Sequence, residues 1–251
     1  MMIIGIGGCT ALLLTGFGIR DSISDLADEQ YEKITVYDYS VSFSSALEGE
    51  ERKAFEEQCA KAISKILYLS ESSGDCSVGE VTKSVYLIVP EETGEAFENF
   101  ISLMDEEGKL SFPGPGEAVI CEKLAEDTGL AVGDTFVLRN GESKEAALRV
   151  SGICRNYVYS YVYISPETFE SAYGAEPEYR TAYILAPEGL DGDEGGALLL
   201  SDSHVLSVSV TANTRSRIQK ILSNLNYIVL LVIVCAGLLA LIVLYDLTNI
   251  N

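Results

Sequence analysis

The sequence predicts an α+β domain that two transmembrane helices, one at each end of the chain, hold outside the cytoplasm. The first observation is that a formal net charge of −21 occurs together with a positive mean hydropathy, so charged and apolar residues must lie in separate segments. All 17 basic residues, and every acidic residue except Asp246, lie between Arg20 and Lys220. The second observation is that this middle section, about 200 residues long, alternates between helical and strand patterns and can bury a core of its own.

The second membrane span is predicted over 227–245, where 19 residues bounded by two tyrosines contain no charge. A helix of this length crosses a hydrocarbon core of about 30 Å, and tyrosine favours the membrane interface. The alternative is a buried helix of a soluble core, but such helices are usually shorter or keep a polar stripe.

The first span is predicted over 1–19, which also contains no charge. A dinucleotide-binding turn would require Gly or Ala where Thr10 stands and an amphipathic helix after it, whereas residues 11–19 have no polar face. A lipoprotein signal ending at Cys9 and a secretory signal both require a basic start, and the apolar run continues ten residues past Cys9. We therefore expect a transmembrane helix that a cytoplasmic leader precedes in the full-length protein.

Small residues recur at every fourth position of the first span, at Gly7, Ala11 and Thr15, and the second span repeats this spacing at Ala236 and Ala240. Side chains of this size let another helix approach closely. These five residues are the candidates for helix packing in a multi-helix membrane domain.

Between the spans, the patterns predict an outer domain with an inserted β-rich lobe. The chain continues from the first span as a stalk helix with Ile23, Leu26, Gln30 and Ile34 spaced along one face. The sequence Phe-Pro-Gly-Pro-Gly at 112–116 breaks the chain and begins the lobe. The predicted segments are a transmembrane helix (1–19), a stalk helix (20–34), the first half of the α/β outer domain (35–111), the β-rich lobe (112–175), the second half of the outer domain (176–212), a stalk helix (213–226), a transmembrane helix (227–245) and the start of a cytoplasmic segment (246–251).

Within the outer domain, alternating apolar residues predict strands, and a 3.6-residue period predicts helices. The expected strands are 34–43, 78–89, 118–121, 135–139, 146–154, 161–164, 181–185 and 205–210. The expected helices are 50–67, 92–104 and one that Asn213 or Thr214 caps and that runs without proline into the second span. Turn signals at 132–134 and 140–141 separate strands of the lobe.

No catalytic set emerges from the middle section. His204 is the only histidine and stands at the start of a strand, where a solvated or hydrogen-bonded role is expected rather than catalysis. The chain has no Gly-x-x-x-x-Gly-Lys-Ser/Thr loop, so we expect it to hold no cofactor and not to hydrolyse ATP itself. Its acidity and the absence of a basic stripe exclude nucleic acid as a partner. The glutamate pairs at 50–51, 56–57 and 106–107 are expected to be solvated rather than metal ligands.

Four of the six cysteines lie in the middle section, at Cys59, Cys76, Cys121 and Cys154, without zinc-knuckle or Cys-x-x-Cys spacing. Two of them end apolar runs, which favours buried thiols, and disulfides stay the alternative.

Sequence motifs at both ends resemble the FtsX-like permease family. They are Ser-Leu-Asn-Tyr from Ser223, Cys-Ala-Gly-Leu-Leu-Ala at 235–240 and the final segment 243–251. The segment 8–23 is similar to the first span of large permeases of this family in Gram-positive bacteria, and the motifs at 122–125, 132–134 and 152–158 are similar to the extracytoplasmic region. The chain departs from the family at Asp246, where asparagine is usual, and it stops at Asn251, before the coupling segment expected of a permease.

The resemblance implies the permease subunit of an ABC transporter, with an outer domain like that of MacB-type permeases and without enzyme activity of its own. Its expected partners are a separate cytosolic ATPase that uses the ATP, the remaining transmembrane helices, the lipid bilayer and a second copy of the chain. The stalk helices would transmit motion outward, for export or mechanotransmission. The membrane-edge residues would serve as joints, and they are Arg20, Asp21, Asn224, Asn226, Asp246, Thr248 and Asn249.

This assignment places residues 20–226 outside the cytoplasm of a cell-membrane protein. The basic residues that flank the spans, Arg20, Arg215, Arg217 and Lys220, would alone favour the opposite orientation, but long domains translocate largely regardless of charge. The competing class is a two-helix receptor with an extracytoplasmic sensor domain, which the segment after Asn251 would distinguish. A membrane-anchored hydrolase is third, because no nucleophile and base constellation is present.

Overall fold

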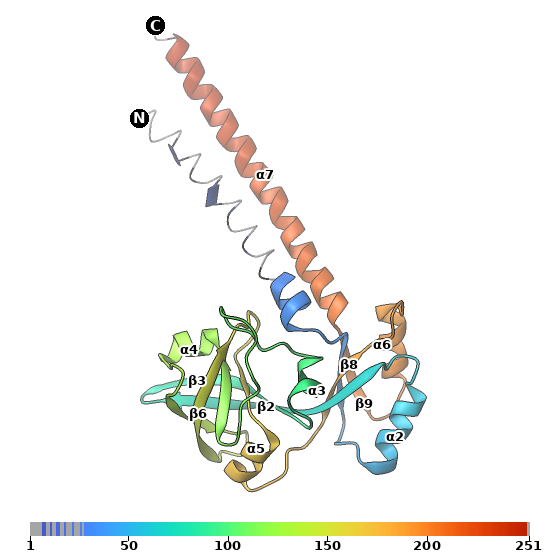
Figure 1. The fold of residues 1–251 in the computed structure, drawn as a ribbon. Helices are drawn as coiled ribbons and strands as arrows, with labels where there is room; N and C mark the ends of the chain where they lie inside the picture. Colours follow the sequence, from blue (N-terminus) through green and yellow to red (C-terminus); the bar gives the residue numbers. More distant parts are fainter. Residues whose placement is uncertain are drawn as a thin grey trace. The chain divides into compact units, whose positions relative to one another are not determined.

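The computed structural model describes residues 28–249 and, before them, Gly7, Gly8, Ala11, Leu14, Thr15, Gly18, Ser22 and Leu26, all in helical conformation. The chain divides into an outer unit, residues 30–213, and a helical unit, residues 1–29 with 214–251 (Figure 1). In the part of the chain that the structure describes, no helix is both long enough and apolar enough to cross a membrane. Neither predicted span is therefore confirmed, and most of residues 1–19 lie outside the described residues.

The elements follow one another as a short π-helix, nine strands and six α-helices among the described residues. In chain order they are η1 (Glu29–Ile34), β1 (Tyr39–Phe43), α2 (Gly49–Gln58), β2 (Lys65–Val78), β3 (Val81–Pro90), α3 (Glu95–Glu98), β4 (Glu117–Cys121), α4 (Glu122–Thr128), β5 (Thr135–Arg139), β6 (Glu145–Cys154), β7 (Tyr161–Tyr163), α5 (Pro166–Tyr173), β8 (Thr181–Leu185), α6 (Gly192–Leu200), β9 (Val205–Val210) and α7 (Thr211–Asn249).

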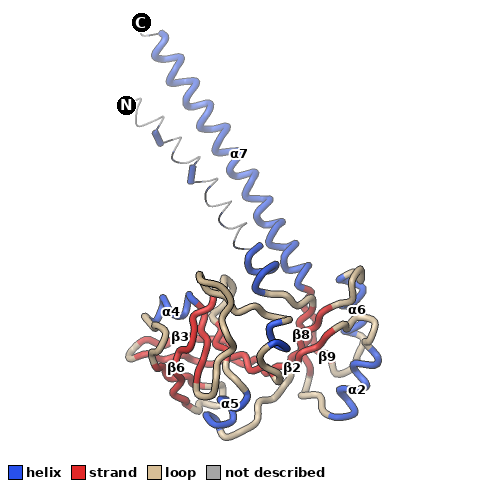
Figure 2. Tube along the Cα trace, in the orientation of Figure 1, coloured by secondary structure: helices blue, strands red, loops and turns tan. Residues whose placement is uncertain are grey.

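Six strands of the outer unit form a closed barrel of mixed parallel and antiparallel pairs. The strands follow the order β3-β7-β4-β6-β5-β2, and β2 also pairs with β3, which closes the ring. The pairs β3–β7 and β4–β6 are parallel, and the others are antiparallel. The strands β8, β1 and β9 extend from β2 as an antiparallel sheet (Figure 2). The outer unit thus combines a small barrel with a flanking sheet.

The 14-residue strand β2 belongs to both the barrel and the flanking sheet. Its first residues, 65–69, pair with β8, whereas 75–77 pair with β5 and 69–78 with β3. A glycine is required where β2 meets β5, because a Cβ at Gly74 would lie 2.7 Å from the backbone oxygen of Arg139. The barrel is therefore joined to the sheet by one continuous strand.

Two predicted helices are shorter than their patterns indicated. The helix predicted over 50–67 is α2, which ends at Gln58, and β2 already begins at Lys65 because the apolar run there pairs with β8. The helix predicted over 92–104 is reduced to the four residues of α3. Phe100 and Ile101 are buried as an amphipathic pattern requires, but the backbone at Ile101 forms a β-bridge with Thr35 instead of a further helical turn.

Most predicted strands are confirmed. The predictions over 135–139, 181–185 and 205–210 coincide with β5, β8 and β9, and those over 118–121, 146–154 and 161–164 differ from β4, β6 and β7 by one residue. The strand predicted over 34–43 is confined to β1, since η1 ends at Ile34 and Thr35 forms only an isolated bridge with Ile101. The strand predicted over 78–89 corresponds to β3, which begins at Val81. The strand β2 before Val78 and the helices α4, α5 and α6 were not predicted.

The core of the outer unit consists of three apolar clusters. One fills the barrel, one lies between the flanking sheet and the helices α2 and α6, and one lies beneath α3. In the second cluster Phe55 of α2 meets the ring of Phe43 edge-on, with the ring centres 5.1 Å apart. Arg52 fixes the same helix to β2, because its guanidinium lies 4.0 Å from the ring centre of Tyr68 and its Nη1 donates to both carboxylate oxygens of Glu91 at 2.9 Å.

The four cysteines of the middle section are free thiols buried in these clusters, as predicted. Burial raises the pKa of Cys59 and of Cys76 to about 11. Both side chains therefore act as small apolar groups and stay protonated at neutral pH.

Candidate functional site

The three predicted helix-packing residues of the first span lie among the described residues. Gly7, Ala11 and Thr15 are helical and exposed, and a Cβ added at Gly7 would have no heavy atom within 4 Å. The Thr15 hydroxyl donates to the carbonyl oxygen of Ala11 at 2.8 Å, a bond within the helix. Ala236 and Ala240 lie on α7, and their side chains are outside the described part of the structure. Helix packing at these five positions stays a prediction.

The predicted membrane-edge joints are also untested. Arg20 and Asp21 lie outside the described residues. The other five lie on α7, where the backbone is described and their side chains are not: Asn224, Asn226, Asp246, Thr248 and Asn249. A contact that was not predicted is the ion pair between Arg215 and Asp28 of the helical unit, with 3.3 Å between Nη2 and Oδ1.

The helix α7 leaves the outer unit directly from a strand. Val210 ends β9 and Thr211 begins α7, so no loop separates the two elements. The junction is held by main-chain and side-chain bonds, from the Thr211 N–H to the Asp38 carbonyl oxygen at 2.9 Å and from Asn213 Nδ2 to Asp193 Oδ1 at 2.7 Å. The prediction of an uninterrupted helix after residue 213 is therefore confirmed, with a start two residues earlier.

The segment that enters the outer unit at its other end is anchored by a buried amide. Gln30 of η1 is 4 % exposed, and its Nε2 donates to Asn156 Oδ1 at 3.0 Å and to Thr35 Oγ1 at 3.2 Å. Its Oε1 accepts from the backbone N–H of Tyr157 at 2.8 Å. The backbone oxygen of Gln30 accepts from the Thr35 N–H at 2.8 Å, the i to i+5 bond of a π-helix, a form frequent at functional sites. We call this set of bonds the Gln30 joint.

Sequence reasoning placed Gln30 on the apolar face of the stalk but did not recognise the joint. The available signal was a polar side chain in a row of apolar ones, which must find hydrogen-bond partners when buried. Its partners stand 126 residues away in the chain, so local patterns could not identify them.

The joint leads to an exposed aromatic surface on the barrel. Asn156 is 5 % exposed, and its Nδ2 donates to the backbone oxygens of Val158 and Tyr159. Tyr159 is 60 % exposed and has a backbone φ of 63°, a left-handed conformation that bulky residues rarely adopt. Its ring lies edge-on to that of Tyr86 at 5.2 Å and to that of Tyr161 at 6.2 Å between centres. The loop is therefore held in a strained form that presents a tyrosine to solvent.

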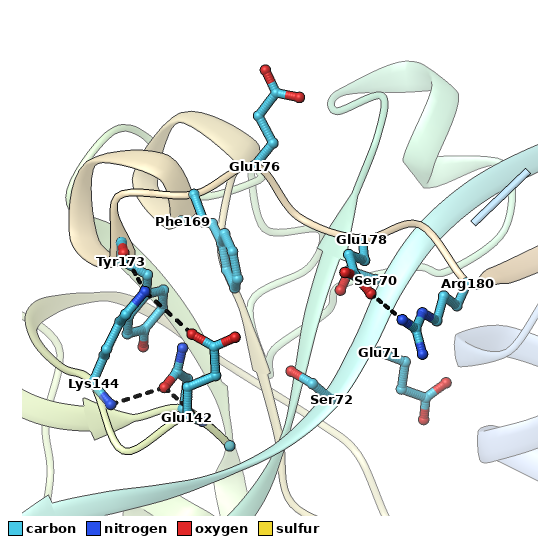
Figure 3. Close-up of a pocket in the computed structure, with 13 residues that line it drawn as sticks. Ser70, Glu71, Ser72, Glu142, Lys144, Phe169, Tyr173, Glu176, Glu178 and Arg180 are labelled. Carbon is cyan, nitrogen blue, oxygen red and sulfur yellow. Dashed lines mark hydrogen bonds and ion pairs between the residues drawn. The ribbon is translucent and has the colours of Figure 1, made fainter. Parts of the chain in front are cut away.

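A groove of about 330 Å³ lies beside the middle of β2, between its β8-paired and β5-paired parts (Figure 3). On one side Lys144 Nζ lies 3.2 Å from Glu142 Oε2 and donates to the backbone oxygen of Tyr173 at 3.1 Å. On the other side Arg180 Nη2 lies 2.5 Å from Glu178 Oε2. Both basic residues of the groove are thus paired with carboxylates. Most of the remaining side chains that line the groove are also polar.

His204 and the glutamate pairs were the other residues considered for chemistry in the sequence. His204 precedes β9, and its Nδ1 and backbone N lie 2.9 and 2.8 Å from Asp202 Oδ1, which is the hydrogen-bonded role predicted for it. No group of three or more His, Cys, Asp or Glu side chains that could hold a metal ion occurs in the described ranges. Glu106 and Glu107 line a second, open cavity but do not form such a group.

The combination of a small mixed barrel, a flanking antiparallel sheet and helical segments at both ends agrees with the outer domain expected from the resemblance. A family model described as the MacB-like periplasmic core domain matches residues 1–199. The chain belongs to this family. The expectation of an α+β outer domain of this kind is thereby confirmed, and the MacB-like domain is an extracytoplasmic one.

Solved structures similar to the MacB-like domain are distant in sequence. The extracellular domain of the noncanonic ABC-type transporter YknZ from Gram-positive bacteria is 14% identical, with 68% of this chain and 98% of that chain covered and a TM-score of 0.41. The periplasmic region of MacB from Actinobacillus actinomycetemcomitans is 13% identical, with 77% and 97% covered and a TM-score of 0.45. No curated protein matches the chain.

Proposed function

We propose that this MacB-like domain and its flanking helices belong to the permease subunit of an ABC transporter, in which they couple a separate cytosolic ATPase to work outside the membrane. The observation that carries the proposal is the direct passage from β9 into the 39-residue helix α7. A helix of this length spans about 58 Å at 1.5 Å per residue, enough to reach from an outer domain through a bilayer. The description of the family, a MacB-like periplasmic core domain, supports the extracytoplasmic position of the domain in this proposal.

In this proposal residues 20–226 lie outside the cytoplasm, and the apolar segments 1–19 and 227–245 lie in the cell membrane. The small residues of these segments would pack against the remaining helices of the permease, and a second copy of the chain would complete the membrane part. The membrane-edge residues named from the sequence would be joints. The chain has no phosphate-binding loop, so the ATP is used by the partner ATPase.

Flexibility introduced into α7 tests this coupling. We replace Leu222, Ser223 and Leu225 with glycine in the full-length permease with its ATPase. Each glycine costs about 1 kcal/mol of helix propensity, which is small beside the stability of a folded domain. We expect near-normal expression and ATP turnover but loss of the outward function, measured as the phenotype of cells that depends on the partner ATPase.

The matched control carries alanine at the same three positions, which removes the same side chains but keeps the helix stiff. We expect this control to retain its function. Full activity of the glycine variant would contradict rigid transmission through α7 and would favour the receptor interpretation.

A further inference from the structure

The outer unit is attached to its two flanking segments at two different places. At the C-terminal end, α7 continues from β9, the last strand of the flanking sheet. At the N-terminal end, the main chain after η1 passes to β1 of the same sheet, but the side chain of Gln30 reaches the barrel loop that follows β6. The Gln30 joint is therefore a side-chain connection between η1 and the barrel.

The hydrogen bonds of the Gln30 joint form or break together, because partly shifted arrangements are unfavourable. Gln30 uses both polar atoms of its amide, and Asn156 uses both of its own, in a site where each residue is about 95 % buried. A shift of η1 along the loop would leave several donors and acceptors buried without partners at the same time, which is unfavourable. Movement of η1 is thus passed to the loop or breaks the joint, and small sliding displacements are disfavoured.

The loop that receives this movement carries the strained Tyr159. Its left-handed backbone is held by the bond from Asn156 Nδ2 to the Tyr159 oxygen at 3.2 Å, and Asn156 is itself held by Gln30. Loss of the joint removes the bond that fixes the Asn156 amide, so the bonds from Asn156 to the loop weaken and residue 159 leaves the left-handed region more readily. Its ring would then leave the group formed with Tyr86 and Tyr161, which changes the barrel surface.

We propose that Gln30 is a positioning residue that ties the end of the first stalk segment to the barrel loop 156–160, so that movement of the stalk changes how Tyr159 is presented at the barrel surface. This inference rests on the proposed coupling function, because it assumes that the stalk moves. It adds a second line of transmission to the one through α7, which acts on the sheet and not on the barrel.

The test compares Gln30→Met, which keeps the side-chain length and removes all three side-chain bonds, with Gln58→Met at an exposed glutamine of α2 as the matched control. In the 251-residue chain, amide hydrogen exchange at Tyr157 reports the joint directly, because that N–H donates to Gln30 Oε1. We expect Gln30→Met to speed exchange at Tyr157 about tenfold while the amides of β1 exchange as in the wild type, and Gln58→Met to change neither.

Gln30→Glu separates the bonds of the joint. A carboxylate still accepts from the Tyr157 N–H but cannot donate to Asn156 Oδ1, so we expect exchange at Tyr157 to stay within about twofold of the wild type while exchange at residues 159–161 rises. The pair Gln30→Met with Asn156→Leu should raise exchange in the loop by less than the two single effects combined, since both residues act in one network.

The functional arm places Gln30→Met in the full-length permease with its ATPase. We expect ATP turnover to be kept and the outward function to fall at least tenfold. Unchanged protection at Tyr157, a uniform rise that includes β1, or full outward function in spite of a local change at Tyr157 would each overturn the inference. None of these results bears on the permease assignment, which fails instead if the wild-type protein shows no ATPase-dependent function.

Discussion

The packing of α6 on the flanking sheet leaves no space for a methyl group at Gly195. A Cβ built there would lie 2.2 Å from Tyr39 Oη and 2.9 Å from both Tyr39 Cζ and Leu190 Cδ2. Tyr39 is 1 % exposed, so its ring cannot retreat into solvent. We therefore predict that Gly195→Ala destabilises the outer unit, although alanine is the better helix former.

The expected size follows from two opposing contributions. Overpacking of a tight core lowers the free energy of unfolding by about 1 to 3 kcal/mol, and alanine in place of glycine in a helix raises it by about 0.5 to 1 kcal/mol. The net loss in the free energy of unfolding is therefore up to about 2.5 kcal/mol, which for a unit of this size lowers Tm by up to about 10 °C. Urea unfolding followed by tyrosine near-UV circular dichroism measures it, because the chain has 14 tyrosines and no tryptophan.

Two further variants identify the cause. Tyr39→Phe removes the oxygen at 2.2 Å, so the double variant Gly195→Ala with Tyr39→Phe should recover about half of the loss or more. Gly237→Ala in α7 meets no heavy atom within 4 Å and should not lower stability. A Gly195→Ala protein as stable as the wild type would refute the reasoning, because α6 would then have room to move away from β1.

Two other predictions concern the barrel and the buried thiols. Gly74→Ala should lower the free energy of unfolding by about 1 to 3 kcal/mol in urea unfolding, since its Cβ would lie 2.7 Å from the Arg139 backbone oxygen. The control Gly114→Ala, whose nearest contact is at 3.5 Å, should change this free energy by less than about 0.5 kcal/mol. Equal effects of the two variants would show that β2 and β5 can separate freely. The pKa of Cys59 and of Cys76 is raised by burial from the ordinary 9.0 to about 11, so above pH 9 the unfolded chain loses thiol protons that the fold keeps. The contribution of these thiols to stability is complete below about pH 9 and is lost as the pH rises to about 11. The difference in unfolding free energy between pH 8 and pH 10 should therefore be smaller in a Cys59→Ala, Cys76→Ala variant than in the wild type. An unchanged difference would contradict the raised pKa of these thiols.

Local sequence signals exist for two of the helices that were not predicted, but not for the groove. The helices α5 and α6 have their caps in the sequence, since the side chain of Ser165 accepts from the Thr168 N–H and that of Asp191 from the N–H groups of Asp193 and Glu194. The first residues of both helices therefore carry a local signal in the sequence. The groove beside β2 had no such signal, because its lining comes from three separate stretches of the chain.

The sequence by itself determined the elements whose pattern is local. Short apolar-rich runs of five or six residues were sufficient for β5, β8 and β9, and the proline-free run after residue 213 for α7. The resemblance to MacB-type permeases was sufficient for the family of the outer domain, whose model matches residues 1–199. These features depend on neighbours within a few positions, which a linear pattern records.

Only the tertiary structure decided β2, the barrel and the Gln30 joint. The run Ser70-Glu-Ser-Ser-Gly74 has no apolar alternation, and it is a strand because β3 pairs along its whole length while β8 and β5 pair at its two ends. Gln30 binds Asn156 for the same reason. A buried backbone or side-chain amide needs a hydrogen-bond partner, and the folded chain, not the neighbouring sequence, determines which residue that partner is.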